Sequence, residues 1–260
     1  MPLDVSFLGP EVYILGLMWL RCSPPTVLVL ALLLGCGRAF ADDLADFNAA
    51  VENAAAHNRV AIGYLRTGNK DLALLEIDRL RAAWDQVAQR FMAKRPAAFD
   101  GNPLYGNLWT TESTRFVGID LMITMGNADA VARALNGLRG DLYDLRKASG
   151  IVVLADCVRD ANAVMDAFMV YNDRALDWGN AEVRNDVAAK AKSYGDTLDR
   201  CETIAGDAVR KEPEFRRLID GAKASLGFIP QAVTNRDADL LHRVLIELRS
   251  FDNLLAFRFG

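Results

Sequence analysis

The sequence contains few of the residues that most often carry chemistry. Its 260 residues include only two histidines, His57 and His242, and neither follows a glutamate at the Glu-x-x-His spacing of di-iron carboxylate sites. The absence of Cys-x-x-Cys-His excludes covalent c-type haem. A Gly-x-Ser-x-Gly motif, a P-loop and a glycine-rich dinucleotide loop are also absent, so catalysis is the least favoured class of function.

The chain also lacks an excess of positive charge. It has 30 Lys and Arg residues against 34 Asp and Glu, a net charge of −4, with no basic block and no aromatic residues interleaved with Lys or Arg. Since nucleic-acid binding depends on a basic surface, we expect no nucleic-acid partner. Sustained period-two alternation is missing as well, and we therefore expect no β-sheet.

The first 41 residues have the pattern of a secretory signal peptide. An apolar run of ten residues, Thr26–Gly35, follows the basic residue Arg21 and precedes Ala39-Phe40-Ala41, an A-x-A cleavage motif. The run is too short to cross a bilayer, which takes about 20 residues. We therefore predict a signal peptide over residues 1–41, a mature chain from Asp42 without a membrane span, and a periplasmic or secreted location.

Two alternatives remain at this end of the chain. Leu33-Leu34-Gly35-Cys36 is similar to a bacterial lipobox, in which Cys36 would carry a lipid and anchor the mature protein. Translation from Met18 would shorten the region before the apolar run. The preferred interpretation is a freely soluble product cleaved after Ala41, with a lipoprotein anchored through Cys36 as the alternative.

Cleavage at that site would leave two cysteines, Cys157 and Cys201. In an oxidising compartment a disulfide between them is the default expectation. It would close a loop of about 45 residues and stabilise the fold by up to about 4 kcal/mol in the chain-entropy model. Two separate buried thiols are the alternative.

A short motif, Asn followed two residues later by an acid, occurs at Asn69, Asn127, Asn180 and Asn235, at intervals of 58, 53 and 55 residues. Glycine precedes the first three asparagines, and glycine readily adopts the left-handed conformation that ends a helix. Asparagine then caps the next helix, whose positive end the acid meets in the first turn. The motif therefore predicts four tight helix–turn–helix corners.

Apolar residues recur at helical spacing on both sides of each corner. After the first corner the stripe consists of Leu74, Ile77, Leu80, Trp84 and Val87. The pattern predicts an all-α fold of about eight helices in four antiparallel hairpins, arranged either as a helical repeat stack or as two packed four-helix units. Residues 42–260 would form a single domain, with halves 42–150 and 151–260 as the alternative division.

The first corner is similar to the hairpin junction of tetratricopeptide repeats. The residues that carry the likeness are Ala61, Tyr64, Thr67, Gly68, Asn69, Asp71 and Ala73. That family repeats every 34 residues or so, whereas the interval here is much longer, so the resemblance implies helical hairpins and not membership. Helix length and export are also similar to those of periplasmic four-helix cytochromes.

Two sets of residues are candidates for a site. The irregular stretch Lys94–Ser113 holds Phe99, Tyr105 and Trp109, which could form the rim of a ligand site, because long loops are often functional. The structural alternative is that these aromatic side chains seal one end of a bundle. His57 and His242 could ligate haem or a metal such as copper if the first and last helices pack together; solvated histidines are the alternative.

Together these patterns favour an exported, non-catalytic helical binding or scaffold protein without a cofactor. Its partner would be another periplasmic protein or a small ligand. The alternative function is a periplasmic haem- or metal-binding redox accessory protein that uses His57 and His242.

Overall fold

A computed structural model describes residues 25–172 and 175–260, with side chains from Asp43 onward. Residues up to Ala41 form a unit of their own, of which only a helix backbone is described. The proposed start at Met18 therefore lies outside the described residues, and Cys36 lies where no side chain is described. The signal-peptide and lipoprotein hypotheses accordingly stay predictions.

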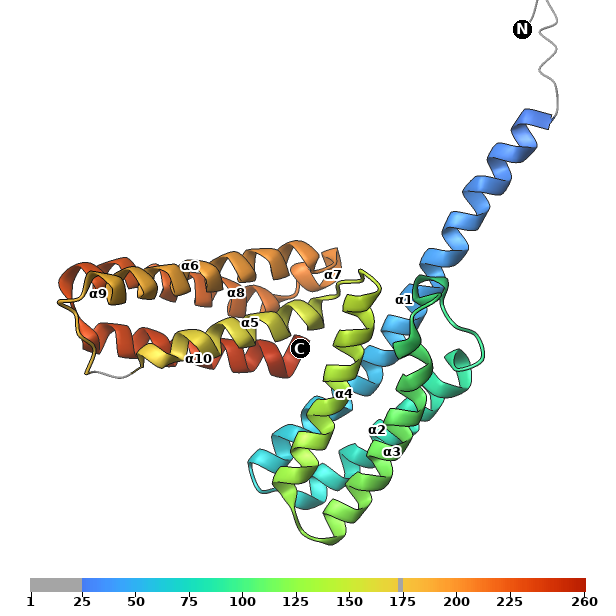
Figure 1. Cartoon of the computed structure of the whole chain (residues 1–260), viewed down its shortest axis with the longest axis horizontal. Coiled ribbons are helices and arrows are strands. Elements are labelled where there is room, and N and C mark those ends of the chain that lie inside the picture. The colour runs from blue at the N-terminus through green and yellow to red at the C-terminus, as the bar shows by residue number, and fades with distance from the viewer. Residues whose placement is uncertain (1–24, 173–174) are drawn as a thin grey trace, which may run out of the picture. The chain divides into compact units, whose positions relative to one another are not determined.

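The described residues form helices and no strands, which confirms the all-α fold (Figure 1). The first group of elements is α1 (Pro25–Arg66), α2 (Lys70–Phe91), η1 (Ala97–Phe99), α3 (Pro103–Thr124) and α4 (Ala128–Ala148). The second group is α5 (Leu154–Phe168), η2 (Met169–Tyr171), α6 (Ala181–Ile204), α7 (Asp207–Arg210), α8 (Pro213–Leu226), α9 (Ile229–Asn235) and α10 (Ala238–Phe259).

The buried apolar residues form two separate clusters. One joins α1, α2, α3 and α4, and includes Phe47, Leu80 and Leu138. The other is built mainly from α5, α6, α8 and α10, which lie side by side in Figure 1. Each helix turns its apolar stripe towards one of the two clusters. This separation favours two four-helix units over a continuous repeat stack.

The first two corners have the predicted backbone geometry. Gly68 and Gly126 have φ of 75° and 69°, in the left-handed region. The backbone N–H of each following asparagine donates to a carbonyl in the last turn of the preceding helix, at 2.9 Å for Asn69 and 3.0 Å for Asn127. Asn127 also accepts from the N–H of Ala130 through its side chain, but Asn69, although it occupies the N-cap position, makes no side-chain cap bond.

At the third corner Asn180 caps α6 as predicted, with its side chain accepting from the N–H of Glu182. The tight turn is not found there, because Gly179 does not have a positive φ and residues 172–180 separate η2 from α6. The prediction for Asn235 is wrong, because Asn235 is the last residue of α9 and Asp237 caps α10. Arg236, at φ 55°, takes the left-handed position that glycine occupies at the first two corners. Aspartate caps a helix as well as asparagine does, so the motif is shifted by two residues here.

The stretch Lys94–Ser113 is more regular than predicted. It contains η1, and α3 begins at Pro103. The side chain of Asn102 accepts from the N–H of Leu104 at 3.0 Å, and Pro103 stands at the first helical position, where its missing N–H and fixed φ are favourable. These two residues together start a helix inside the expected loop.

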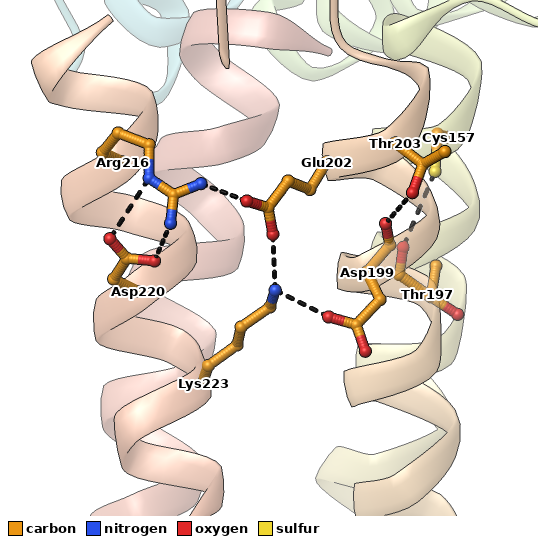
Figure 2. A network of polar contacts seen from close by, with 8 residues as sticks. All are labelled: Cys157, Thr197, Asp199, Glu202, Thr203, Arg216, Asp220 and Lys223. Carbon is orange, nitrogen blue, oxygen red and sulfur yellow. Dashed lines mark hydrogen bonds and ion pairs between the residues drawn. The ribbon is translucent and has the colours of Figure 1, made fainter. Parts of the chain in front are cut away.

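Two cross-links join helices of the second group. The sulfur atoms of Cys157 on α5 and Cys201 on α6 lie 2.17 Å apart, as in the predicted disulfide. Between α6 and α8, Lys223 Nζ lies 2.6 Å from carboxylate oxygens of both Asp199 and Glu202, and Arg216 continues the network (Figure 2). Every charge in this network has a partner within it, so it offers no free group to a ligand.

Candidate functional site

The three aromatic residues proposed as a ligand rim are buried in the first core. Phe99 is fully buried, and its ring stacks on that of Tyr105 with centroids 5.3 Å apart. Tyr105 contacts Trp109 edge-on, at 5.4 Å, and donates a 2.6 Å hydrogen bond to the carbonyl of Phe91. Their burial leaves little surface for a ligand and agrees with the structural alternative, in which they seal the bundle.

The structure separates the two histidines. His57 Nδ1 lies 2.7 Å from Glu76 Oε2 on α2, whereas His242 Nδ1 lies 3.3 Å from the carbonyl of Asn172 in the second group. The carbonyl of Phe257 on α10 contacts α1. His242 lies about 22 Å along the same helix from Phe257, and so lies far from that contact. Within the described parts of the chain, no group of three or more His, Cys, Asp and Glu side chains is placed to hold a metal ion.

A different region has the features of a binding site. A cavity of about 270 Å³, here named the junction cavity, lies where α1, α4 and the start of α5 meet α7 and the end of α10. Its apolar wall includes Val51, Ala55, Leu142, Val209 and Phe259. Its charged residues are Glu52, Arg139, Arg146, Asp156, Arg159 and Arg258.

Both acids of the junction cavity are already paired with arginine. Asp156 receives a bidentate interaction from Arg146, with Nε to Oδ2 at 2.7 Å and Nη2 to Oδ1 at 2.5 Å, and both side chains are buried. Glu52 accepts from Arg59 Nη2 at 2.6 Å. Asp156 is therefore fully engaged, whereas Glu52 also acts to raise the pKa of Arg139 and so balances part of its charge.

Among the described residues, Arg139, Arg159 and Arg258 of the wall make no direct ion pair with a side-chain carboxylate, although Glu52 lies near Arg139 and Glu214 lies near Arg258. Arg159 donates instead to the carbonyl of Arg139 at 3.2 Å and lies over the ring of Tyr143, 4.5 Å from its centroid. Burial, and then the nearby guanidinium groups of Arg59 and Arg159, lower the pKa of Arg139. The junction cavity thus holds more arginines than acidic side chains, in a chain that is acidic overall.

Two further polar features face the same cavity. The side-chain Oδ1 of Asn48 is buried without a hydrogen-bond partner. The N-terminus of α5 begins after Val153, which cannot cap it, so the N–H groups of Leu154 and Ala155 are left without an intrahelical acceptor. Unpaired polar groups in a cavity wall are expected where a ligand or an ordered water completes the hydrogen bonding.

Arg139 also lines a second, more polar cavity of about 220 Å³. Arg59, Arg66 and Arg249 contribute to that wall, and Arg249 pairs with Asp166 at 2.6 Å. Arg139 therefore lies between the two cavities and is the residue that lines both of them.

Sequence reasoning missed the junction cavity, since its residues come from five helices and form no local motif. The available signal was weak. Arg139 and Arg146 share the face of α4 that carries Leu142, so two charged residues occupy positions where the helical pattern expects apolar ones.

Comparisons with protein-family models, with curated proteins and with solved structures gave no match. From Asp43 onward, none of the described helices combines the length and the hydropathy needed to cross a membrane. The function is therefore inferred from the chemistry of the junction cavity.

Proposed function

We propose that the protein is an exported, non-catalytic binding protein that holds a small ligand in the junction cavity. The observation that carries the proposal is a concave, mostly apolar wall with a few convergent polar groups, which is the usual composition of a ligand site. At about 270 Å³ the cavity lies just below the usual range of about 300 to 1,000 Å³ for such sites, so the ligand is small.

The residues of the wall support binding over catalysis. The described side chains that line the cavity include no His, Cys, Ser, Thr or Lys, the groups that most often act as nucleophile or base. The two carboxylates, Glu52 and Asp156, are each held by an arginine. A wall of this kind can orient and neutralise a ligand without transferring a proton to it.

Export is supported by the signal-peptide pattern of residues 1–41 and by the pairing of Cys157 with Cys201, since disulfides form in oxidising compartments. A soluble periplasmic product would begin at Asp42, and a lipoprotein would begin at lipidated Cys36. Expression of the full chain in a bacterium, followed by cell fractionation and N-terminal sequencing, separates these two products from a chain that is not processed.

A substitution that fills the junction cavity with a larger side chain tests the binding proposal. Ala55 lines the junction cavity, while Ala49, on the same helix, is exposed and does not. We expect octanoate or octan-1-ol, used as probes, to raise the melting temperature of the wild type and of Ala49→Phe, because a ligand that binds the folded state stabilises it. Ala55→Phe should lose the effect. The proposal is contradicted if neither probe shifts the wild type, or if Ala55→Phe responds as the wild type does.

A further inference from the structure

We infer that the ligand of the junction cavity is a carboxylate of about nine non-hydrogen atoms in all, most of them in an apolar body. This inference rests on the proposed function and names the chemical class of the ligand. It follows from three properties of the wall, namely its excess of arginines over acidic side chains, the geometry of its donors, and its size and apolar surface.

The charge of the wall favours an anion. Four arginines and two acidic side chains line the cavity, and both acids are engaged in ion pairs, one of them with an arginine outside the wall. Gly260, the last residue of the sequence, also lines the cavity, and its main-chain oxygen accepts from Arg59. Arg139, Arg159 and Arg258 make no direct ion pair among the described residues, so the wall holds more guanidinium groups than acidic side chains. Holding a partly buried guanidinium without a counter-charge costs free energy, and a bound anion offsets that cost.

The donors match a carboxylate. A guanidinium group presents parallel N–H donors that fit the two oxygens of a carboxylate, as the Arg146–Asp156 pair in the same wall already shows. The uncapped N–H groups of Leu154 and Ala155 add further donors, of the kind that bind anions at helix N-termini. The headgroup is therefore expected beside Arg139 and the start of α5.

The remaining wall selects an apolar body. Val51, Leu142, Val209 and Phe259 present hydrocarbon surface that a fully polar anion such as inorganic phosphate would leave in contact with water. A volume of about 270 Å³, at roughly 30 Å³ for each water-sized group, holds about nine such groups. Medium-chain fatty acids and small aromatic acids have this size and polarity.

Isothermal titration calorimetry with octanoate and octan-1-ol tests the inference, because the two probes share the chain and differ in the headgroup. We expect the wild type to bind octanoate at least about tenfold more tightly than octan-1-ol, since a charge-assisted hydrogen bond is worth more than a neutral one. Arg139→Gln should weaken octanoate binding about tenfold and change octan-1-ol binding less than about twofold. Arg133→Gln, an exposed arginine on the same helix, is the matched control and should change neither.

A second variant keeps the test valid if Arg139→Gln is unstable. Arg258 is exposed at its position on α10, so Arg258→Gln should fold and still weaken octanoate binding selectively. Equal affinity for octanoate and octan-1-ol in the wild type would overturn the carboxylate assignment while leaving the proposed binding function intact. Failure of both probes to bind would overturn the proposed function itself.

Discussion

Arg59 Nη1 donates a 2.8 Å hydrogen bond to the main-chain oxygen of Gly260, the last residue of the sequence, 201 residues further along the chain. The Nε of the same guanidinium donates to the carbonyl of Phe257 at 3.0 Å, and Nη2 pairs with Glu52. One buried side chain of α1 thus fixes the last turn of α10, and it does so at the edge of the junction cavity, which Gly260 lines.

Replacing Arg59 should therefore weaken the fold. We expect Arg59→Met to lower the free energy of unfolding by about 2 to 4 kcal/mol, because it leaves two carbonyls without their charged donor. Urea denaturation followed by circular dichroism measures the change. Arg66→Gln, an exposed arginine on the same helix, should cost less than about 0.5 kcal/mol; a similar loss in both variants would show that the contacts of Arg59 with α10 contribute little.

Glu112 should make stability depend on pH. It is fully buried on α3, and burial, followed by a hydrogen bond with Asp141, raises its pKa to about 8. Between its ordinary pKa and about 8, the unfolded chain releases this proton while the folded chain keeps it. The contribution of Glu112 to stability is therefore complete at low pH and is lost as the pH rises through about 8.

Glu112→Gln removes this titration while keeping the shape of the neutral side chain. Relative to the wild type, we expect the variant to gain stability as the pH is raised from about 5 to about 9, by an amount of the order of a few kcal/mol. Glu247→Gln, at an exposed position, should show no such trend. A constant difference between Glu112→Gln and the wild type across this range would mean that Glu112 is ionised in the folded protein throughout.

The left-handed residue at the fourth corner offers a stabilising substitution. Arg236, at φ 55°, occupies a conformation that costs an ordinary residue about 1 kcal/mol or more and costs glycine little. Arg236→Gly should raise the free energy of unfolding by about 0.5 to 1 kcal/mol, and the reciprocal change, Gly126→Arg, should lower it by a similar amount. Thermal unfolding of both variants provides the measurement, and a destabilised Arg236→Gly would argue against the left-handed conformation.

The disulfide between Cys157 and Cys201 should be detectable by peptide mapping and should contribute to the free energy of unfolding. Peptide mapping of the unreduced protein is expected to recover the two cysteines in one cross-linked pair, which reduction separates. The double variant Cys157→Ala, Cys201→Ala should lose about 3 to 4 kcal/mol in urea denaturation, because its unfolded chain gains freedom. Recovery of both residues as free thiols from protein isolated under oxidising conditions would contradict the link.

The helical corners were predictable from sequence because their physics is local. A residue able to adopt φ > 0, a capping side chain and a first-turn acid lie within four consecutive positions, and apolar spacing identifies the helices on either side. The prediction for Asn235 was wrong because the motif assumes that the capping residue is asparagine. The backbone requires only a capping oxygen, which Asp237 supplies. Arg236 in the glycine position carries no local signal of its role.

The junction cavity was not predictable because it depends on which helices meet. Arg139 and Asn48 lie far apart in the sequence, and each appears ordinary within its own helix. The aromatic residues Phe99, Tyr105 and Trp109, which stand out in the sequence, are explained by packing in the first core. In this protein, therefore, the residues that stand out in the sequence are not the residues that line the junction cavity.

The most direct measurement is the position of a heavy-atom-labelled ligand. Crystals grown with 8-bromooctanoate, and measured at the bromine absorption edge, would locate the bromine by its anomalous scattering and the carboxylate by electron density. The carboxylate should lie against the guanidinium of Arg139, with the bromine among Val51, Leu142 and Val209. Bromine signal confined to other surfaces, with the junction cavity filled only by water, would contradict the proposed site.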